Sequence, residues 1–109
     1  METRMESDSA IVFVAVDGSD IVGYVGALIR EYPPIFTIQE YGFIEEIAVT
    51  ADRRRQGIAT RLWSAAEEWL RSRGLTTIRV NINVNNPDSQ GFFRSLGFTD
   101  DTETLLKKY

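Results

Sequence analysis

The stretch EEIAVTADRRRQGIATRL, residues 45–62, decides the fold, because a strand ends and a helix begins within it. Its first part closes an apolar segment predicted as a strand over residues 41–49, and its second part opens a helix with apolar residues at helical spacing. Gly57 stands at the start of that helix, directly after three arginines. A helix N-terminus exposes unbonded backbone N–H groups, and glycine lets an anion approach them closely. The junction therefore predicts a phosphate or pyrophosphate site, with a solvated turn as the alternative.

The composition limits the chemistry that the chain can perform. It has 109 residues, enough for one domain, a net charge of −4 and a pI of about 4.8. Such an acidic chain lacks the broad basic face of a general nucleic-acid binder. The absence of cysteine and histidine excludes disulfides, thiolate catalysis, a Ser-His-Asp triad and the usual zinc sites. Acid–base chemistry would therefore use carboxylates, tyrosine, lysine or water, and we expect no metal.

The location of the protein is predicted from its polar start and its short apolar runs. The opening METRMESDSA is acidic and polar, unlike a signal peptide. The longest apolar run, residues 21–29, is too short and too rich in glycine to span a bilayer. We therefore expect a soluble, cytoplasmic protein with no membrane or nucleic-acid partner.

Working outward from residues 45–62, the remaining elements follow from apolar periodicity and turn residues. We expect residues 1–10 to be a flexible lead-in and residues 11–109 to form a single domain. Strands are predicted at residues 11–16, 21–30, 41–49, 77–84 and from residue 98 onward, and helices at residues 58–73 and after Asn86. The order β-β-β-α-β-α-β predicts an α/β fold of the α+β mixed-sheet kind, an antiparallel meander followed by a right-handed parallel crossover.

Two motifs resemble signatures of one family. Arg54-x-x-Gly57-x-Ala59, after a strand that ends at Val49, resembles the acetyl-CoA-binding motif of the GNAT superfamily of N-acetyltransferases. The segment NPDSQGFFRSLGF, residues 86–98, resembles the second signature of that family, an Asn, an aromatic pair and then Leu-Gly-Phe. The resemblance covers residues 11–109. It implies an acyltransferase that moves acetyl from acetyl-CoA to a primary amine by direct attack in a ternary complex. The alternative is a CoA-binding regulatory or assembly module with little or no catalysis.

The resemblance also implies which residues hold the cofactor. Backbone groups at the end of the central strand would bond the pantetheine arm, and the loop and first helical turn would hold the pyrophosphate. Asn86 would contact the cofactor or the splayed strands, and a plain helix cap is its alternative role. The expected cofactor-binding residues are Ile47, Ala48, Val49, Arg54, Arg55, Gln56, Gly57, Ile58, Ala59, Thr60 and Asn86.

Two carboxylates, Glu45 and Glu46, are the candidate catalytic residues. In the family a carboxylate, often through water, removes the proton of the acceptor amine. Strand alternation predicts that the two lie on opposite faces, so that at most one of them faces the substrate directly. We favour Glu45 because it would share a face with Ile47 and Val49, with Glu46 second; ordinary surface carboxylates are the alternative. Phe93 occupies the position of the family's usual tyrosine acid, and phenylalanine cannot donate a proton.

The start of the chain departs from the family pattern. The family fold normally begins with a strand and two helices, and this sequence lacks them before residue 11. Because such an omission would expose apolar surface, we expect a homodimer or a partner chain that completes the fold. The identity of the acceptor amine stays open between a small amine, an antibiotic, a peptide N-terminus and a protein lysine.

Overall fold

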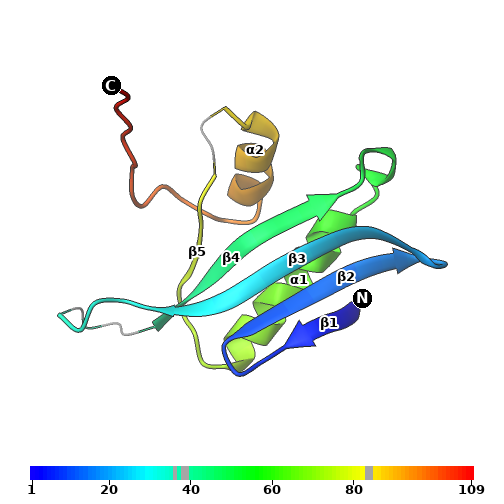
Figure 1. Cartoon of the computed structure of the whole chain (residues 1–109), viewed down its shortest axis with the longest axis horizontal. Helices are drawn as coiled ribbons and strands as arrows, with labels where there is room; N and C mark the ends of the chain where they lie inside the picture. The colour runs from blue at the N-terminus through cyan, green and yellow to red at the C-terminus, as the bar shows by residue number, and fades with distance from the viewer. Residues whose placement is uncertain (36, 38–39, 83–84) are drawn as a thin grey trace.

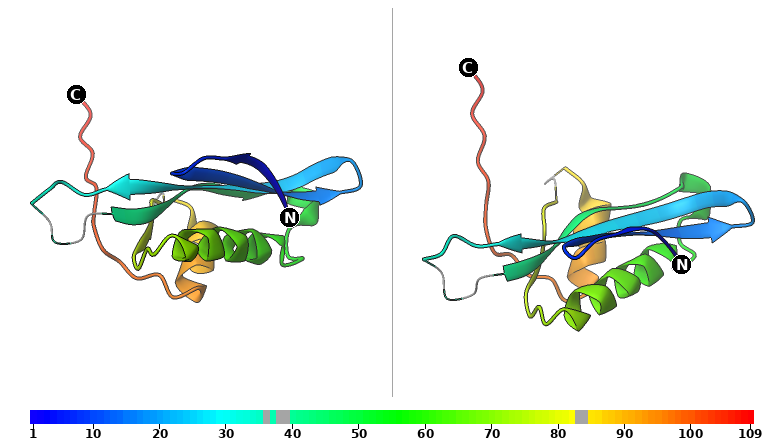
Figure 2. Two further views of the ribbon diagram at one scale, coloured as in Figure 1. Left: turned by 90° about the horizontal axis from the view of Figure 1, so that it is seen from below. Right: turned by 60° about the horizontal axis from the view of Figure 1, so that its bottom comes forward.

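A five-stranded mixed sheet, with both helices on one of its sides, makes up the computed structural model, which describes residues 1–35, 37, 40–82 and 85–109 (Figures 1 and 2). The spatial order of the strands equals their chain order. The strands are β1 (Glu2–Glu6), β2 (Ala10–Asp17), β3 (Asp20–Glu31), β4 (Glu40–Val49) and β5 (Ile78–Val80). The helices are the 3-10 turn η1 (Ala51–Arg53), α1 (Ile58–Ser72) and α2 (Pro87–Ser95). Strands β1 to β4 are antiparallel and β5 is parallel to β4, which confirms the predicted α+β mixed sheet.

The core lies between α1 and the sheet. Leu62, Ala66 and Leu70, one helical turn apart along α1, are fully buried. Two glycines let the helix lie close to the strands. A Cβ on Gly23 would come within 2.9 Å of the Ala48 carbonyl oxygen and 3.1 Å of a Leu62 methyl carbon, and a Cβ on Gly42 would come within 2.9 Å of Leu70. Both glycines therefore mark the face of the sheet that α1 covers.

A β-bulge interrupts β4 in its centre. Gly26 of β3 pairs with Glu46, but the next residue, Ala27, pairs with Ile44, so Glu45 is the extra residue. Parallel pairing with β5 stops at the same level, because it involves only Gly42–Ile44 of β4. After β5 ends at Val80, the chain turns away from β4 toward α2 (Figure 1). The bulge therefore coincides with the point where the two strands separate.

The start of the chain is a strand, which corrects the expected lead-in over residues 1–10. Residues 2–6 form β1, which pairs with β2. Glu6 at its end accepts a hydrogen bond from the indole nitrogen of Trp69 at 3.0 Å and pairs with Arg73 at 3.3 Å. These contacts with the end of α1, distant in sequence, fix a segment that has no apolar pattern of its own.

Two predicted strands differ in the structure. The strand expected over residues 77–84 is regular only at Ile78–Val80; residues 81 and 82 lie outside it because β4 diverges there, and residues 83 and 84 lie outside the described residues. Residues 98–109, expected to begin a last strand, contain no strand or helix. Ion pairs from Arg94 to Asp100 and from Arg79 to Asp101 hold this segment through side chains instead of a backbone ladder. Among the described residues, no helix is long and apolar enough to cross a membrane.

Candidate functional site

The turn between β4 and α1 forms a cradle of backbone N–H groups. Gly57 is the N-cap of α1 with a left-handed φ of 76°, and no side chain caps the helix there. The first turn of α1 contains no acidic residue, and a Cβ on Gly57 would meet nothing within 4 Å. The amides of residues 58–60 therefore have no intrahelical acceptor, and the space beside the Gly57 Cα is open, as an anion site requires.

The three arginines before Gly57 have different surroundings. Arg53 bonds to Asp17, at the tip of the β2–β3 hairpin, so its charge is already compensated. Arg54 donates from Nε to the Val49 carbonyl oxygen at 3.4 Å, which ties the loop to the end of β4. Arg55 has a left-handed φ of 67° and forms no hydrogen bond or ion pair within the described part of the chain. Arg54 and Arg55 are therefore the two cations available to an anion at the cradle.

A cavity of about 200 Å³ opens where β4 and β5 separate. Its walls come from the bulge of β4, from the residues at and after the end of β5, and from α2. The lining residues are Ile44, Glu45, Glu46, Ile47, Val80, Asn81, Ile82, Asn86, Ser89 and Phe93. The sequence singles out Glu45, Glu46, Ile47, Asn86 and Phe93 among them. It does not single out Ser89, whose position in the first turn of α2 carries no distinctive signal.

The bulge places both catalytic candidates on the same face of the sheet, which corrects the prediction of opposite faces. Gly42 faces α1, so by alternation Phe43 and Glu45 face away from it. A Cβ on Gly26 would lie 3.9 Å from the Cβ of Glu45, on that same outer face. Glu46 pairs with Gly26 across the strands and faces outward as well. Both carboxylates are exposed and line the cavity.

The two carboxylates nevertheless differ in their partners. Glu46 accepts a hydrogen bond from the hydroxyl of Tyr24 on β3, and this bond raises the pKa of Tyr24. Tyr24 therefore stays protonated and able to donate at neutral pH. Glu45 forms no hydrogen bond or ion pair with any described residue, so its carboxylate is free to accept a proton.

Asn86, Ser89 and Phe93 line the cavity from α2 and its N-cap. The side chain of Asn86 accepts a hydrogen bond from the Ser89 amide at 3.1 Å, and Pro87 occupies the first helical position. Asn86 is thus a helix cap and a cavity residue at once. Phe93 is 3% exposed and packs edge-to-face against Phe92 and Phe98. At the position of Phe93 this wall is a phenyl ring, which has no proton to donate.

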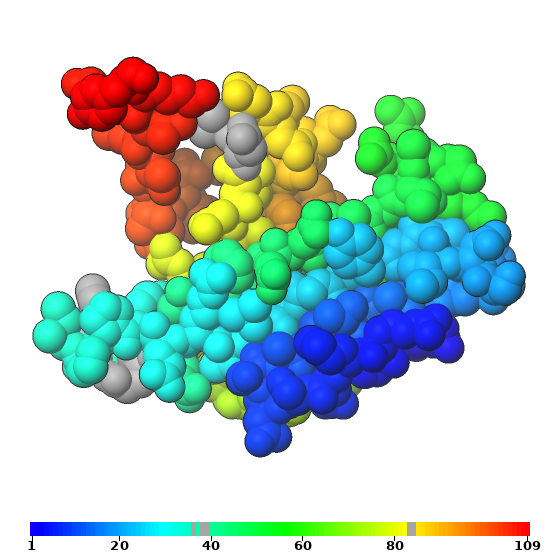
Figure 3. Space-filling view, in the orientation of Figure 1, coloured from blue at the N-terminus to red at the C-terminus, as the bar shows by residue number. Residues whose placement is uncertain are grey.

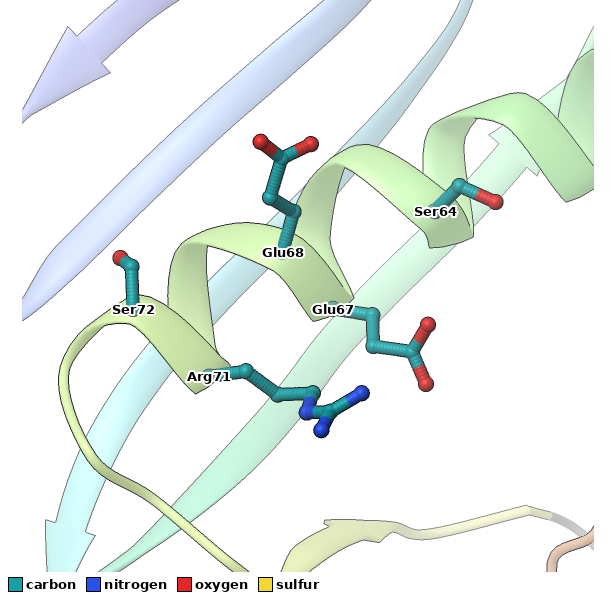
Figure 4. A pocket seen from close by; sticks show the side chains of 5 residues that line it. All are labelled: Ser64, Glu67, Glu68, Arg71 and Ser72. Carbon is teal, nitrogen blue, oxygen red and sulfur yellow. The ribbon is translucent and has the colours of Figure 1, made fainter.

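A second depression lies on the outer surface of α1, away from the cavity. Figure 4 shows the side chains that line it: Ser64, Glu67, Glu68, Arg71 and Ser72. All five come from one helix and extend away from it, and no second element encloses them. We assign no function to this surface.

The anion cradle and the cavity lie at two ends of one line along β4. The cradle follows the C-terminal end of β4 at Val49, and the carboxylates lie at the bulge, three to four residues earlier. Residues 47–49 join the two and have left the parallel ladder with β5. An extended molecule with an anionic end could therefore lie along β4 with its other end beside Glu45.

Comparison with known proteins places this geometry in context. The family model described as "Acetyltransferase (GNAT) family" matches residues 2–98. An aminoglycoside N(6')-acetyltransferase type 1 of Klebsiella aerogenes is 32% identical over 92 residues, which cover 84% of this chain and 60% of that protein. N-alpha-acetyltransferase 30 of Schizosaccharomyces pombe is 31% identical over 86 residues, 79% of this chain and 55% of that protein. The chain thus spans little more than half the length of these curated relatives.

One solved structure shows the same fold. The apo aminoglycoside 6'-N-acetyltransferase of Acinetobacter haemolyticus superposes with a TM-score of 0.79 at 28% identity, over 94% of this chain and 72% of that chain.

Proposed function

This chain belongs to the acetyltransferase (GNAT) family, and on that basis we propose that it transfers an acetyl group from acetyl-CoA to a primary amine. The observation that carries the proposal is the alignment, along β4, of an open amide cradle with a cavity that holds two carboxylates. The amide cradle would bind the phosphates of CoA. A carboxylate in the cavity would accept the proton that the amine loses when it is acylated.

The residues of the chain fit such a cosubstrate. The amides of Ile58, Ala59 and Thr60 would bond the pyrophosphate, with Gln56 and the two uncompensated arginines beside it. Backbone groups of residues 47–49 would bond the pantetheine arm where β5 has left the ladder. Asn86, the N-cap of α2, lines the cavity on the side opposite β4. The cosubstrate would supply the activated acetyl thioester.

Glu45 is the proposed proton acceptor for the amine. Its carboxylate lines the cavity and has no other partner among the described residues, so it can accept a proton directly or through water. Glu46 is the second candidate, and the hydroxyl of Tyr24 holds it in place. In this proposal the amine attacks the thioester directly while both substrates are bound.

A CoA-binding module without turnover is the second candidate function. Phe93 favours it, because its phenyl ring in the cavity wall cannot donate a proton to the departing thiolate. Release of free thiol from acetyl-CoA, measured with a panel of amines, distinguishes the two. Turnover with any amine supports the enzyme. CoA binding in calorimetry, without thiol release from any amine, would select the module.

The acceptor and the assembly state belong to the same proposal. The names of the relatives indicate an aminoglycoside acceptor for one and an α-amino group for the other, so an aminoglycoside and a short peptide belong in the panel. We also propose a cytoplasmic homodimer, supported by large apolar side chains that are more than half exposed at Ile21 and Leu105. Light scattering after size exclusion tests it, and a monomer at micromolar concentration would contradict it.

A further inference from the structure

Arg30 carries a positive charge that no carboxylate compensates, on the face of the sheet opposite α1. Its guanidinium carbon lies 3.8 Å from the centroid of the Phe43 ring, stacked on a side chain that faces away from α1. Arg30 itself is exposed, and no ion pair involves it within the described residues. Arg79, on the same face, is paired with Asp101. Arg30 is therefore a cation held in place but left uncompensated.

The uncompensated cation lies close to the two candidate catalytic carboxylates. Phe43, beneath the guanidinium, precedes Glu45 by two residues on β4, a separation of about 7 Å along the strand. Gly26 and Leu28 of β3 lie beside these residues in the ladder and add no charge. Figure 3 views this face of β2, β3 and β4 in the orientation of Figure 1, and no described segment crosses it. The face thus has a negative end at the bulge and a positive end at Arg30.

We propose that the acceptor is a zwitterionic amine, a free amino acid or a short peptide, whose amine lies at Glu45 and whose carboxylate binds Arg30. The inference rests on the proposed acetyl transfer and names its substrate class. A guanidinium offers two parallel N–H donors that match a carboxylate, and stacking on Phe43 restricts the orientation of its plane. Half-buried Leu28 supplies an apolar surface for methylene groups between the two charges. A polycationic acceptor would instead bring positive charge against Arg30.

The test compares amines that differ only in the distant charge. Glycine, β-alanine, γ-aminobutyrate and ε-aminocaproate are titrated against the CoA-bound protein by calorimetry, each beside its carboxamide. The best acid of the series is expected to bind about tenfold or more tightly than its amide, the range of a hydrogen bond to a charged group. Arg30→Gln should reduce that ratio to near unity, and Arg30→Lys should restore part of it. Arg71→Gln, which removes an equal charge from the outer side of α1, is the matched control and should leave the ratio unchanged.

Thiol release measured with the same compounds separates the two proposals. Acid-selective binding that depends on Arg30, without any thiol release, supports the zwitterion site and contradicts the proposed activity. Thiol release with an aminoglycoside or a simple amine, without any preference for acids, supports the activity and overturns the zwitterion site. Equal binding of acids and amides, no binding of either, or equal weakening of both by Arg30→Gln would also overturn it.

Discussion

At the scale of the residue, the position of Glu45 in a bulge decides what its side chain can do. In a regular strand only one of two consecutive carboxylates would reach the outer face, but the extra residue directs both of them there. The hydroxyl of Tyr24 then makes the two unequal by bonding to Glu46 alone. The chain thereby gains one restrained and one free carboxylate in the same cavity.

Glu45→Gln tests this difference, because it removes the free proton acceptor and keeps the shape of the side chain. We expect kcat to fall by roughly 10²–10⁴, the usual contribution of a positioned base, with little change in the affinity for CoA. Glu46→Gln should have a smaller effect. The measurement is thiol release under saturating acetyl-CoA. A larger loss of kcat in Glu46→Gln would identify Glu46 as the base instead. Full activity in both variants would exclude Glu45 and Glu46 as the base.

Phe93→Tyr introduces a phenolic proton donor into the cavity wall supplied by α2. If protonation of the leaving thiolate limits turnover, kcat should rise roughly tenfold or more. Phe92→Tyr is the matched control, because Phe92 packs against Phe93 but does not line the cavity. Steady-state kinetics would show the difference. An unchanged kcat in a folded Phe93→Tyr variant would mean that solvent protonates the thiolate without limiting the rate.

At the scale of the element, β4 and α1 act as one unit that joins the cavity to the anion cradle. The sequence predicted both, with bounds within one residue of those observed, because apolar periodicity and helix-start residues are local signals. The anion site that the sequence predicts before α1 stays a prediction, although the helix start there does lack a side-chain cap. The bulge was not predicted, because it is a property of two paired strands: only the register between β3 and β4 identifies the extra residue. The faces of Glu45 and Glu46 were therefore predicted wrongly.

Gly57→Leu should weaken CoA binding by tenfold or more, since a side chain would occupy the space in front of the cradle. Gly18→Leu, in the β2–β3 turn, is the matched control. Gly18 also has a left-handed φ, 62° compared with 76° at Gly57, and a Cβ there would likewise meet nothing within 4 Å. Both variants should lose about 1–2 kcal/mol of unfolding free energy through backbone strain. Calorimetry with CoA and denaturant unfolding separate the two effects. Equal CoA affinity in both variants would contradict the assigned cradle.

Gly23→Ala tests the packing of α1 on the sheet. The new Cβ would lie 2.9 Å from a backbone oxygen that cannot move freely, so we expect a loss of about 1–3 kcal/mol in unfolding free energy. Gly26→Ala, on the same strand but the opposite face, meets its nearest atom at 3.9 Å and should be close to neutral. Urea unfolding measures both. Equal stability of the two variants would show that α1 does not approach β3 closely.

At the scale of the whole molecule, contacts between distant segments determine what local patterns could not predict. The strand β1 has no apolar alternation, and its docking depends on β2 and on the far end of α1. The segment after α2 is held by ion pairs of its side chains, although its sequence predicted a strand. In both cases the contacts that fix the segment come from residues elsewhere in the chain, so the apolar periodicity of the segment itself could not predict its structure.

Glu6→Ala should loosen β1 as a unit, because Glu6 bonds Trp69 and Arg73, more than 60 residues away in sequence. We expect a loss of about 1 kcal/mol in unfolding free energy, since the carboxylate is only partly shielded from water. Amide hydrogen exchange of residues 2–6 should also accelerate. Glu2→Ala is the control, because Glu2 pairs only with its exposed neighbour Arg4 at 3.6 Å. Unaltered exchange in Glu6→Ala would contradict the docking of β1 through this residue.

The bulge in β4 also bears on how such a chain is redesigned or evolves. Deletion of either Glu45 or Glu46 would leave Ile44, Ile47 and the residues beyond in strict alternation, so folding alone gives no reason to keep the additional residue. A selection for stability should therefore tend to lose it, whereas a selection for turnover should retain it. A single-codon deletion library, sorted once for folding and once for activity, would separate these two pressures at this position.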